Sequence, residues 1–213
     1  MPVLLYAVAG SLVPLDAPSG VANSPVCRLE HSGVAIFYSE SDTPEIWLRA
    51  PLSTSVMEFH RVQKEIFRSS AIVPFRFPAI LDSKDELLKH LDERSGTYKD
   101  YLQRFAGCAQ MDLSLTHANA ASPPSSGTAY LHERQSRTRV LEQFAKVLRD
   151  DLAPLITDWR ERSIENGLRC FALVARKQVE EFNEKIKTVS VPPNLSVRVG
   201  GPWPVAEFLD FKL

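Results

Sequence analysis

The stretch that most restricts the fold lies near the end of the chain, at residues 195–208. Leu195, Val197 and Val199 alternate with polar residues, a spacing that predicts a strand. The strand runs into Gly200-Gly201-Pro202-Trp203-Pro204. Glycine reaches backbone angles that other residues avoid, and the two prolines fix φ on both sides of the tryptophan. This segment therefore cannot become a helix, and the Trp203 indole is held on a stiff frame.

Two interpretations of this stretch stay open. Trp203 and Phe208 are large apolar groups placed where a chain end usually frays. They indicate either a tail that packs onto its own core or a rigid surface hook for a partner protein. The stretch carries no reactive group, so catalysis explains it poorly.

The composition limits the partners. A chain of 213 residues suffices for one large domain or two small ones, and its net charge of −1 provides no basic field for nucleic acid or an anionic membrane. No apolar run approaches the roughly 20 residues of a membrane helix. Residues 1–8 lack the basic start of a signal peptide and predict a buried strand. We therefore expect a cytoplasmic protein.

The first half predicts strands and helices in turn. Strands are expected at 3–8, 26–29 and 34–38, with a hairpin turn at His31-Ser32-Gly33 between the last two. A helix capped by Ser53 or Thr54 should run to about Arg68, followed by a short edge strand that ends at Pro74. A second helix, capped by Asp82 or Ser83, should bend at Gly96 and end near Gly107.

Arg76 lies between Phe75 and Phe77, which point to the opposite face if the chain stays extended. An arginine in this setting either pairs with a carboxylate or a ring inside the fold, or is offered to a ligand. The residues alone do not decide between the two.

The second half begins with a half-buried strand at 111–115 and a polar, proline-rich loop at 119–127. Apolar positions from Leu141 to Trp159 predict one long helix that starts near Tyr130, is kinked at Pro154 and is ended by Gly167. A central strand at 170–175, a short helix at 179–186 and the last strand follow.

This order predicts an α+β protein in which helices cover one face of mixed sheets. A split near Gly107 gives two small α+β domains, 1–106 and 107–213, and the second of these carries the C-terminal tail. The second domain is close to a modified ferredoxin-like fold in which one strand is missing or reshaped.

Motifs for chemistry are not found. The sequence has no glycine-rich phosphate loop, no HExxH, no CxxC pair and no nucleophile elbow, and its five histidines share no ligand spacing. Cys27, Cys108 and Cys170 are scattered and odd in number, which favours neither a disulfide framework nor a zinc site. We expect no cofactor, no metal and no enzymatic activity.

The chain resembles the gas vesicle protein GvpL/GvpF family over nearly its whole length. Each matching piece is short, but their order and spacing are specific: Tyr6-Ala7-Val8, His60, Pro74-Phe75-Arg76-Phe77, Gly127-Thr128-Ala129-Tyr130-Leu131, Leu173-Val174-Ala175-Arg176, Phe182, Gly201-Pro202-Trp203-Pro204 and Phe208. Two places depart from the family pattern, with Pro78 where glycine is usual and Val205-Ala206-Glu207 where Pro-Tyr-Ser is usual. The chain therefore resembles a divergent member.

The resemblance implies a non-enzymatic accessory protein, associated with gas vesicles, that binds the small hydrophobic shell protein and assists vesicle assembly. It also implies two α+β domains, the second a modified ferredoxin-like fold, and contact with other gas vesicle accessory proteins. The candidate contact residues are Arg76, Trp203 and Phe208. Two alternatives stay open: a minor structural component of the vesicle wall, and a regulatory α+β module with a ligand pocket near Arg76 and His60.

Overall fold

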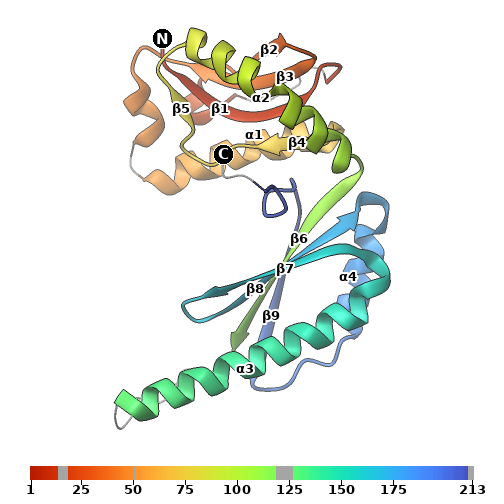
Figure 1. Cartoon of the computed structure of the whole chain (residues 1–213). Coiled ribbons are helices and arrows are strands. Elements are labelled where there is room, and N and C mark those ends of the chain that lie inside the picture. Colours follow the sequence, from red (N-terminus) through yellow and green to blue (C-terminus); the bar gives the residue numbers. More distant parts are fainter. Residues whose placement is uncertain (14–18, 50, 119–126, 211–213) are drawn as a thin grey trace. The chain divides into compact units, whose positions relative to one another are not determined.

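The structure, a computed structural model, describes residues 1–13, 19–49, 51–118 and 127–210. The loop expected at 119–127 lies almost entirely outside these ranges. The chain divides into two compact units, which are drawn in Figure 1. The first contains Met1–Gly107 together with residues 204–210, and the second contains Cys108–Trp203.

The first unit is built on an antiparallel sheet with the strand order β2-β3-β1-β4, and β5 also pairs with β1. Its elements are β1 (Val3–Gly10), η1 (Val21–Asn23), β2 (Cys27–His31), β3 (Val34–Glu40), η2 (Pro44–Leu48), α1 (Leu52–Ser69), β4 (Ile72–Pro74), β5 (Ile80–Leu81) and α2 (Lys84–Arg104).

The first strand is the centre of this unit. Every residue from Val3 to Ala9 is buried, and because neighbouring side chains of a strand point to opposite faces, both faces of β1 are covered. Both α1 and α2 pack against it. The expectation of mixed sheets is wrong, because the strands of both sheets all pair antiparallel. The expectation that one face is covered is wrong for the first unit.

The predicted hairpin and helix starts are mostly confirmed. Ser32 and Gly33 have positive φ angles of 49° and 76° between β2 and β3, as a tight turn requires. Ser83 caps α2, because its hydroxyl accepts a hydrogen bond from the Glu86 amide at 3.2 Å. The cap of α1 is Pro51, not Ser53 or Thr54, and α2 runs through Gly96 without interruption.

The second unit has the order strand, helix, strand, strand, helix, strand. Its elements are β6 (Cys108–His117), α3 (Gly127–Leu152), η3 (Ala153–Leu155), β7 (Ile156–Ile164), β8 (Gly167–Ala175), η4 (Arg176–Gln178), α4 (Val179–Thr188) and β9 (Leu195–Trp203). The antiparallel strand order β7-β8-β6-β9 is that of a ferredoxin-like sheet.

One face of this sheet carries the core. Alternate residues of the two central strands, such as Met111, Leu113, Cys170 and Ala172, pack with apolar side chains of α3 and α4. Figure 1 shows both helices on the same side of the sheet. The other face carries the polar residues of the alternation.

The prediction of one long helix that continues through Trp159 is wrong. Helix α3 ends at Leu152, and residues from Ile156 onward form the strand β7, so no strand of the ferredoxin-like order is missing. Gly167 begins β8 rather than ending a helix. The sequence misled because Leu152, Leu155, Ile156 and Trp159 fit the helical spacing, while Pro154 in fact stops the helix.

The C-terminal tail belongs with the first unit in this structure, whereas the sequence places it in the second half. Val205 and Phe208 are buried there, which explains the grouping of residues 204–210 with Met1–Gly107. Whether 1–106 and 107–213 fold as independent domains stays a prediction. No helix within the described ranges combines the length and the apolar character needed to cross a bilayer.

Candidate functional site

Trp203 ends the last strand, on which two glycines determine its position. It lies opposite Gln110, and Gly200 lies opposite Asp112. A side chain at position 200 would place its Cβ 3.3 Å from the Trp203 Nε1, so the glycine lets the indole lie close to its own strand. Gly201 has φ +125°, and a Cβ there would meet the Gln110 carbonyl oxygen at 3.0 Å. The indole is 37% exposed.

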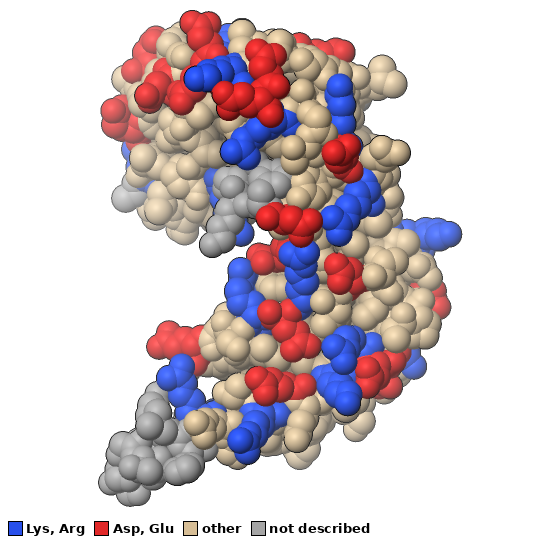
Figure 2. Space-filling view, in the orientation of Figure 1, with Lys and Arg blue, Asp and Glu red and all other residues tan. Residues whose placement is uncertain are grey.

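The sheet face near this tryptophan is polar. Phe171, in the centre of β8, is buried beneath two guanidinium groups, those of Arg162 and Arg169, whose Cζ atoms lie 5.1 and 5.4 Å from the ring centre. Arg169 also donates to Asp112 at 2.8 Å. On the side of the molecule drawn in Figure 2, positive and negative side chains are interspersed. This side therefore has no continuous basic patch of the kind that binds nucleic acid.

Phe208 occupies a different environment. Its side chain is fully buried in the first unit, and the neighbouring backbone is tied to α2. The Asp210 amide donates to the Tyr101 hydroxyl at 3.0 Å, and Arg104 pairs with the Asp210 carboxylate at 3.2 Å. The burial favours a tail that packs onto its own core over a hook at this residue.

Arg76 lies on the surface, between two anchored aromatic rings. Phe75 is buried beside His90 and Tyr98, and Phe77 packs edge-to-face on Phe59 with 5.3 Å between ring centres. Arg76 itself is exposed, and within the described ranges it makes no hydrogen bond or ion pair. The structure therefore holds its backbone firmly while leaving its guanidinium available.

The three candidate residues are distributed over the two units. Arg76 and Phe208 belong to the first unit, and no hydrogen bond or ring contact between them occurs in the described part of the chain. Trp203 belongs to the second unit. Each of the three stays a candidate contact residue.

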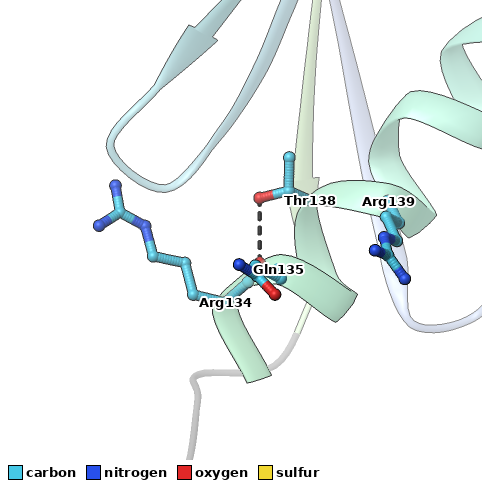
Figure 3. Close-up of a pocket in the computed structure, with 4 residues that line it drawn as sticks. All are labelled: Arg134, Gln135, Thr138 and Arg139. Carbon is cyan, nitrogen blue, oxygen red and sulfur yellow. Dashed lines mark hydrogen bonds between the residues drawn. The ribbon is translucent and has the colours of Figure 1, made fainter. Parts of the chain in front are cut away.

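The regulatory alternative, with a pocket near Arg76 and His60, stays a prediction, and His60 itself takes part in a structural contact. His60 is exposed and lies 3.2 Å from Gln63, which is buried and donates to the carbonyl oxygens of Tyr6 and Phe75, both at 2.7 Å. Gln63 thus joins α1 to the sheet. A hollow of about 360 Å³ lies elsewhere, on α3 (Figure 3), where Arg134 and Arg139 point away from each other.

The three thiols and the His90 imidazole have pKa values shifted by burial. Burial raises the pKa of the Cys170 thiol to about 12 and also raises the pKa of the Cys27 and Cys108 thiols. Burial lowers the pKa of His90, which lies 2.6 Å from the Tyr98 hydroxyl. Among the described residues, no group of three or more His, Cys, Asp or Glu side chains is arranged to hold a metal ion.

Sequence reasoning missed other exposed apolar side chains. Leu48, Leu52 and Met57 are exposed around the start of α1, and Val199 is 39% exposed on β9. The sequence contains a signal that Val199 lies on an apolar strand, because the strand pattern there has a single charged residue, Arg198. The strand assignment alone did not reveal that β9 lies at the edge of its sheet.

Comparison with known proteins agrees with this architecture. The family model described as gas vesicle synthesis protein GvpL/GvpF matches residues 2–210. The fold is similar to the crystal structure of gas vesicle protein GvpF from Anabaena sp. PCC7120, with a TM-score of 0.82, 13% identity and coverage of 100% of this chain and 97% of that one.

A second crystal structure, of GvpF from Microcystis aeruginosa, has a TM-score of 0.79 and 14% identity and covers 97% of this chain and 98% of that one. A search of curated protein sequences gave no significant match. Since the family model spans almost the whole chain, the protein belongs to the GvpL/GvpF family of gas vesicle synthesis proteins.

Proposed function

We propose that this protein is a non-enzymatic assembly factor that binds the small hydrophobic gas vesicle shell protein before the shell polymerises. The observation that carries the proposal is the match of residues 2–210 to a family named for gas vesicle synthesis. An apolar shell subunit is prone to aggregate before it is built into a wall, so a partner that covers its apolar surface would keep it competent for assembly. We place this activity in the cytoplasm, in association with gas vesicles.

The exposed side chains support such a role. Trp203 and Val199 on β9 are both more than one third exposed, and tryptophan is the residue type that most often dominates the energy of a protein interface. Arg76 adds an exposed guanidinium on the first unit. Phe208 contributes indirectly, by holding the tail in place.

Co-purification with the shell protein tests the proposal. The tagged chain is expressed together with the shell protein encoded nearest to it, and the soluble fraction is passed over the affinity resin at ordinary salt. We expect the shell protein to stay soluble and to elute with the tagged chain. Shell protein that aggregates as it does alone would contradict the proposal.

Matched variants then locate the contact. We expect Trp203→Ala and Arg76→Ala to reduce the recovered shell protein severalfold. Ile164→Ala is the control for Trp203, because Ile164 is 39% exposed at the opposite edge of the same sheet. If all three variants retain the shell protein equally, neither candidate residue contacts it.

Washed vesicles separate an assembly factor from a minor wall component. An assembly factor should be lost from mature vesicles during washing, whereas a wall component should remain at a fixed ratio to the shell protein. Retention at a fixed ratio would replace the assembly role by a structural one. A melting temperature that rises with a small molecule, without any effect of the shell protein, would favour a regulatory module instead.

A further inference from the structure

The outer edge of β9 has unused backbone hydrogen-bonding groups. The Ala118 amide donates to the Asn194 carbonyl at 2.9 Å, and this pair lies in the same register as Thr116 with Ser196 and Ser114 with Arg198. Since bonded pairs in an antiparallel ladder recur every second residue, Ser196 and Arg198 bond to β6. The amide and carbonyl groups of Val197 and Val199 therefore point away from the sheet.

No other described segment takes up these outward groups. β9 ends the strand order β7-β8-β6-β9, and within the described ranges no further backbone hydrogen bond reaches Val197 or Val199. An uncovered edge of this kind is a template for one more strand.

The opposite edge of the same sheet is protected. β7 carries the charged residues Asp158, Arg160, Glu161 and Arg162, and a bulge between Ile156 and Asp158 interrupts its pairing. Charges and bulges are the usual means by which natural sheets prevent unwanted strand addition. β9 has one charged residue, Arg198, and its valines alternate with it. β9 also has a bulge, after Gly200, and contains Pro202, but its residues 195–199 pair with β6 in unbroken register. This stretch of β9 is therefore better suited to receive a strand than β7.

The side chains of β9 define what the added strand must carry. Val197 and Val199 lie on the helix-covered side of the sheet, with Val199 39% exposed, so they favour apolar neighbours. Arg198 is exposed on the other side, where a carboxylate directly across from it would be favourable. We propose that β9 binds an apolar strand of the shell protein that bears an acidic residue opposite Arg198, an inference that rests on the proposed function.

Proline substitution tests this edge selectively. Val199→Pro removes an amide that points outward and keeps the bonds to β6, since proline is tolerated on an edge strand. Val199→Thr is the control, because it keeps the amide and a β-branched side chain of similar size. We expect Val199→Pro to lower recovery of the shell protein at least tenfold and Val199→Thr to lower it less than threefold. Arg198→Glu should lower it as well.

Amide hydrogen exchange gives a second readout that needs no variant. When the unmodified chain binds the shell protein, the Val197 and Val199 amides should exchange at least tenfold more slowly, because they acquire acceptors. The Arg198 amide, already bonded to β6, should change little. Unchanged exchange at both valines in a formed complex would overturn the edge proposal and leave the proposed function standing.

The remaining outcomes are also decisive. If the unmodified chain recovers no shell protein, the proposed function fails and this proposal fails with it. If Val199→Pro converts a dimer of this chain to a monomer while recovery of the shell protein is unchanged, the edge binds a second copy of the chain, and the shell-strand proposal is wrong.

Discussion

The last strand and the tail that follows it are neighbours in the chain, but they are held by different means. β9 ends in Trp203, whose indole is partly exposed beside Gly200 in the second unit. The tail carries Phe208, whose ring is completely buried in the first unit. Two aromatic residues from one sequence motif thus have opposite exposures. The comparison teaches that a strong motif can combine an anchor and a surface group.

The largest effect should come from the anchor. We expect Phe208→Ala to destabilise the first unit by about 3–5 kcal/mol, because it removes a fully buried ring and leaves a cavity. Hydrogen exchange followed by mass spectrometry should show faster exchange in peptides from α2 and β1, with β6 and β8 unchanged. A stable variant that has lost shell binding would instead make Phe208 a contact residue and break the comparison.

The next effect should come from the strand itself. Gly201→Ala should destabilise the second unit by about 1–3 kcal/mol, since φ at this position is +125° and the new methyl would crowd the Gln110 carbonyl oxygen. The same exchange measurement should now show faster exchange in β6 and β9 while α2 stays protected. An equal increase of exchange in α2 would mean that β9 and the tail do not stabilise separate units.

Sequence reasoning succeeded where local signals were strong. The turn at Ser32 and Gly33, the cap at Ser83 and the central strand β8 all follow from short patterns and were predicted correctly. It failed at β7, because an edge strand with charges on both faces lacks the alternation that marks a strand, and its few apolar residues happen to fit a helix.

The candidate contact residues were harder to predict from the sequence than the fold. The types of the residues at 203 and 208 indicate large apolar groups but not which of them is buried, because exposure depends on packing between segments distant in the chain. For Arg76 the sequence allowed either an ion pair or ring contact inside the fold or an exposed guanidinium. The side chain is exposed because the two flanking rings, Phe75 and Phe77, pack onto the fold. The edge position of β9 depends on sheet order, which no local pattern encodes.

A smaller effect on stability should accompany Trp203→Ala. We expect a loss of about 1 kcal/mol or less, since the indole is 37% exposed, although binding to the shell protein should fall severalfold. Urea unfolding of the full chain, compared with Ile164→Ala, measures the stability change. A loss as large as that of Phe208→Ala would show that Trp203 is a second anchor rather than a surface group.

The smallest effect should come from the ion pair at the end of the tail. Asp210→Asn removes the charge that faces Arg104 and keeps the backbone amide that donates to Tyr101. Both side chains of the pair are more than half exposed, so the change should be about 0.5 kcal/mol and should shrink further in high salt. A larger, salt-independent loss would mean that the carboxylate itself fixes the tail.

The placement of Phe208 has a consequence for the order of events during synthesis. Residues 204–210 leave the ribosome after all of residues 108–203, yet they complete the core of the unit that was made first. At a translation rate of about 5–20 residues per second, several seconds pass between the synthesis of residue 107 and that of Phe208, the last buried ring of the first unit. A chain interrupted before this point lacks the ring that completes the core of its first unit. The tail therefore links the stability of the first unit to the synthesis of residues that follow the whole second unit.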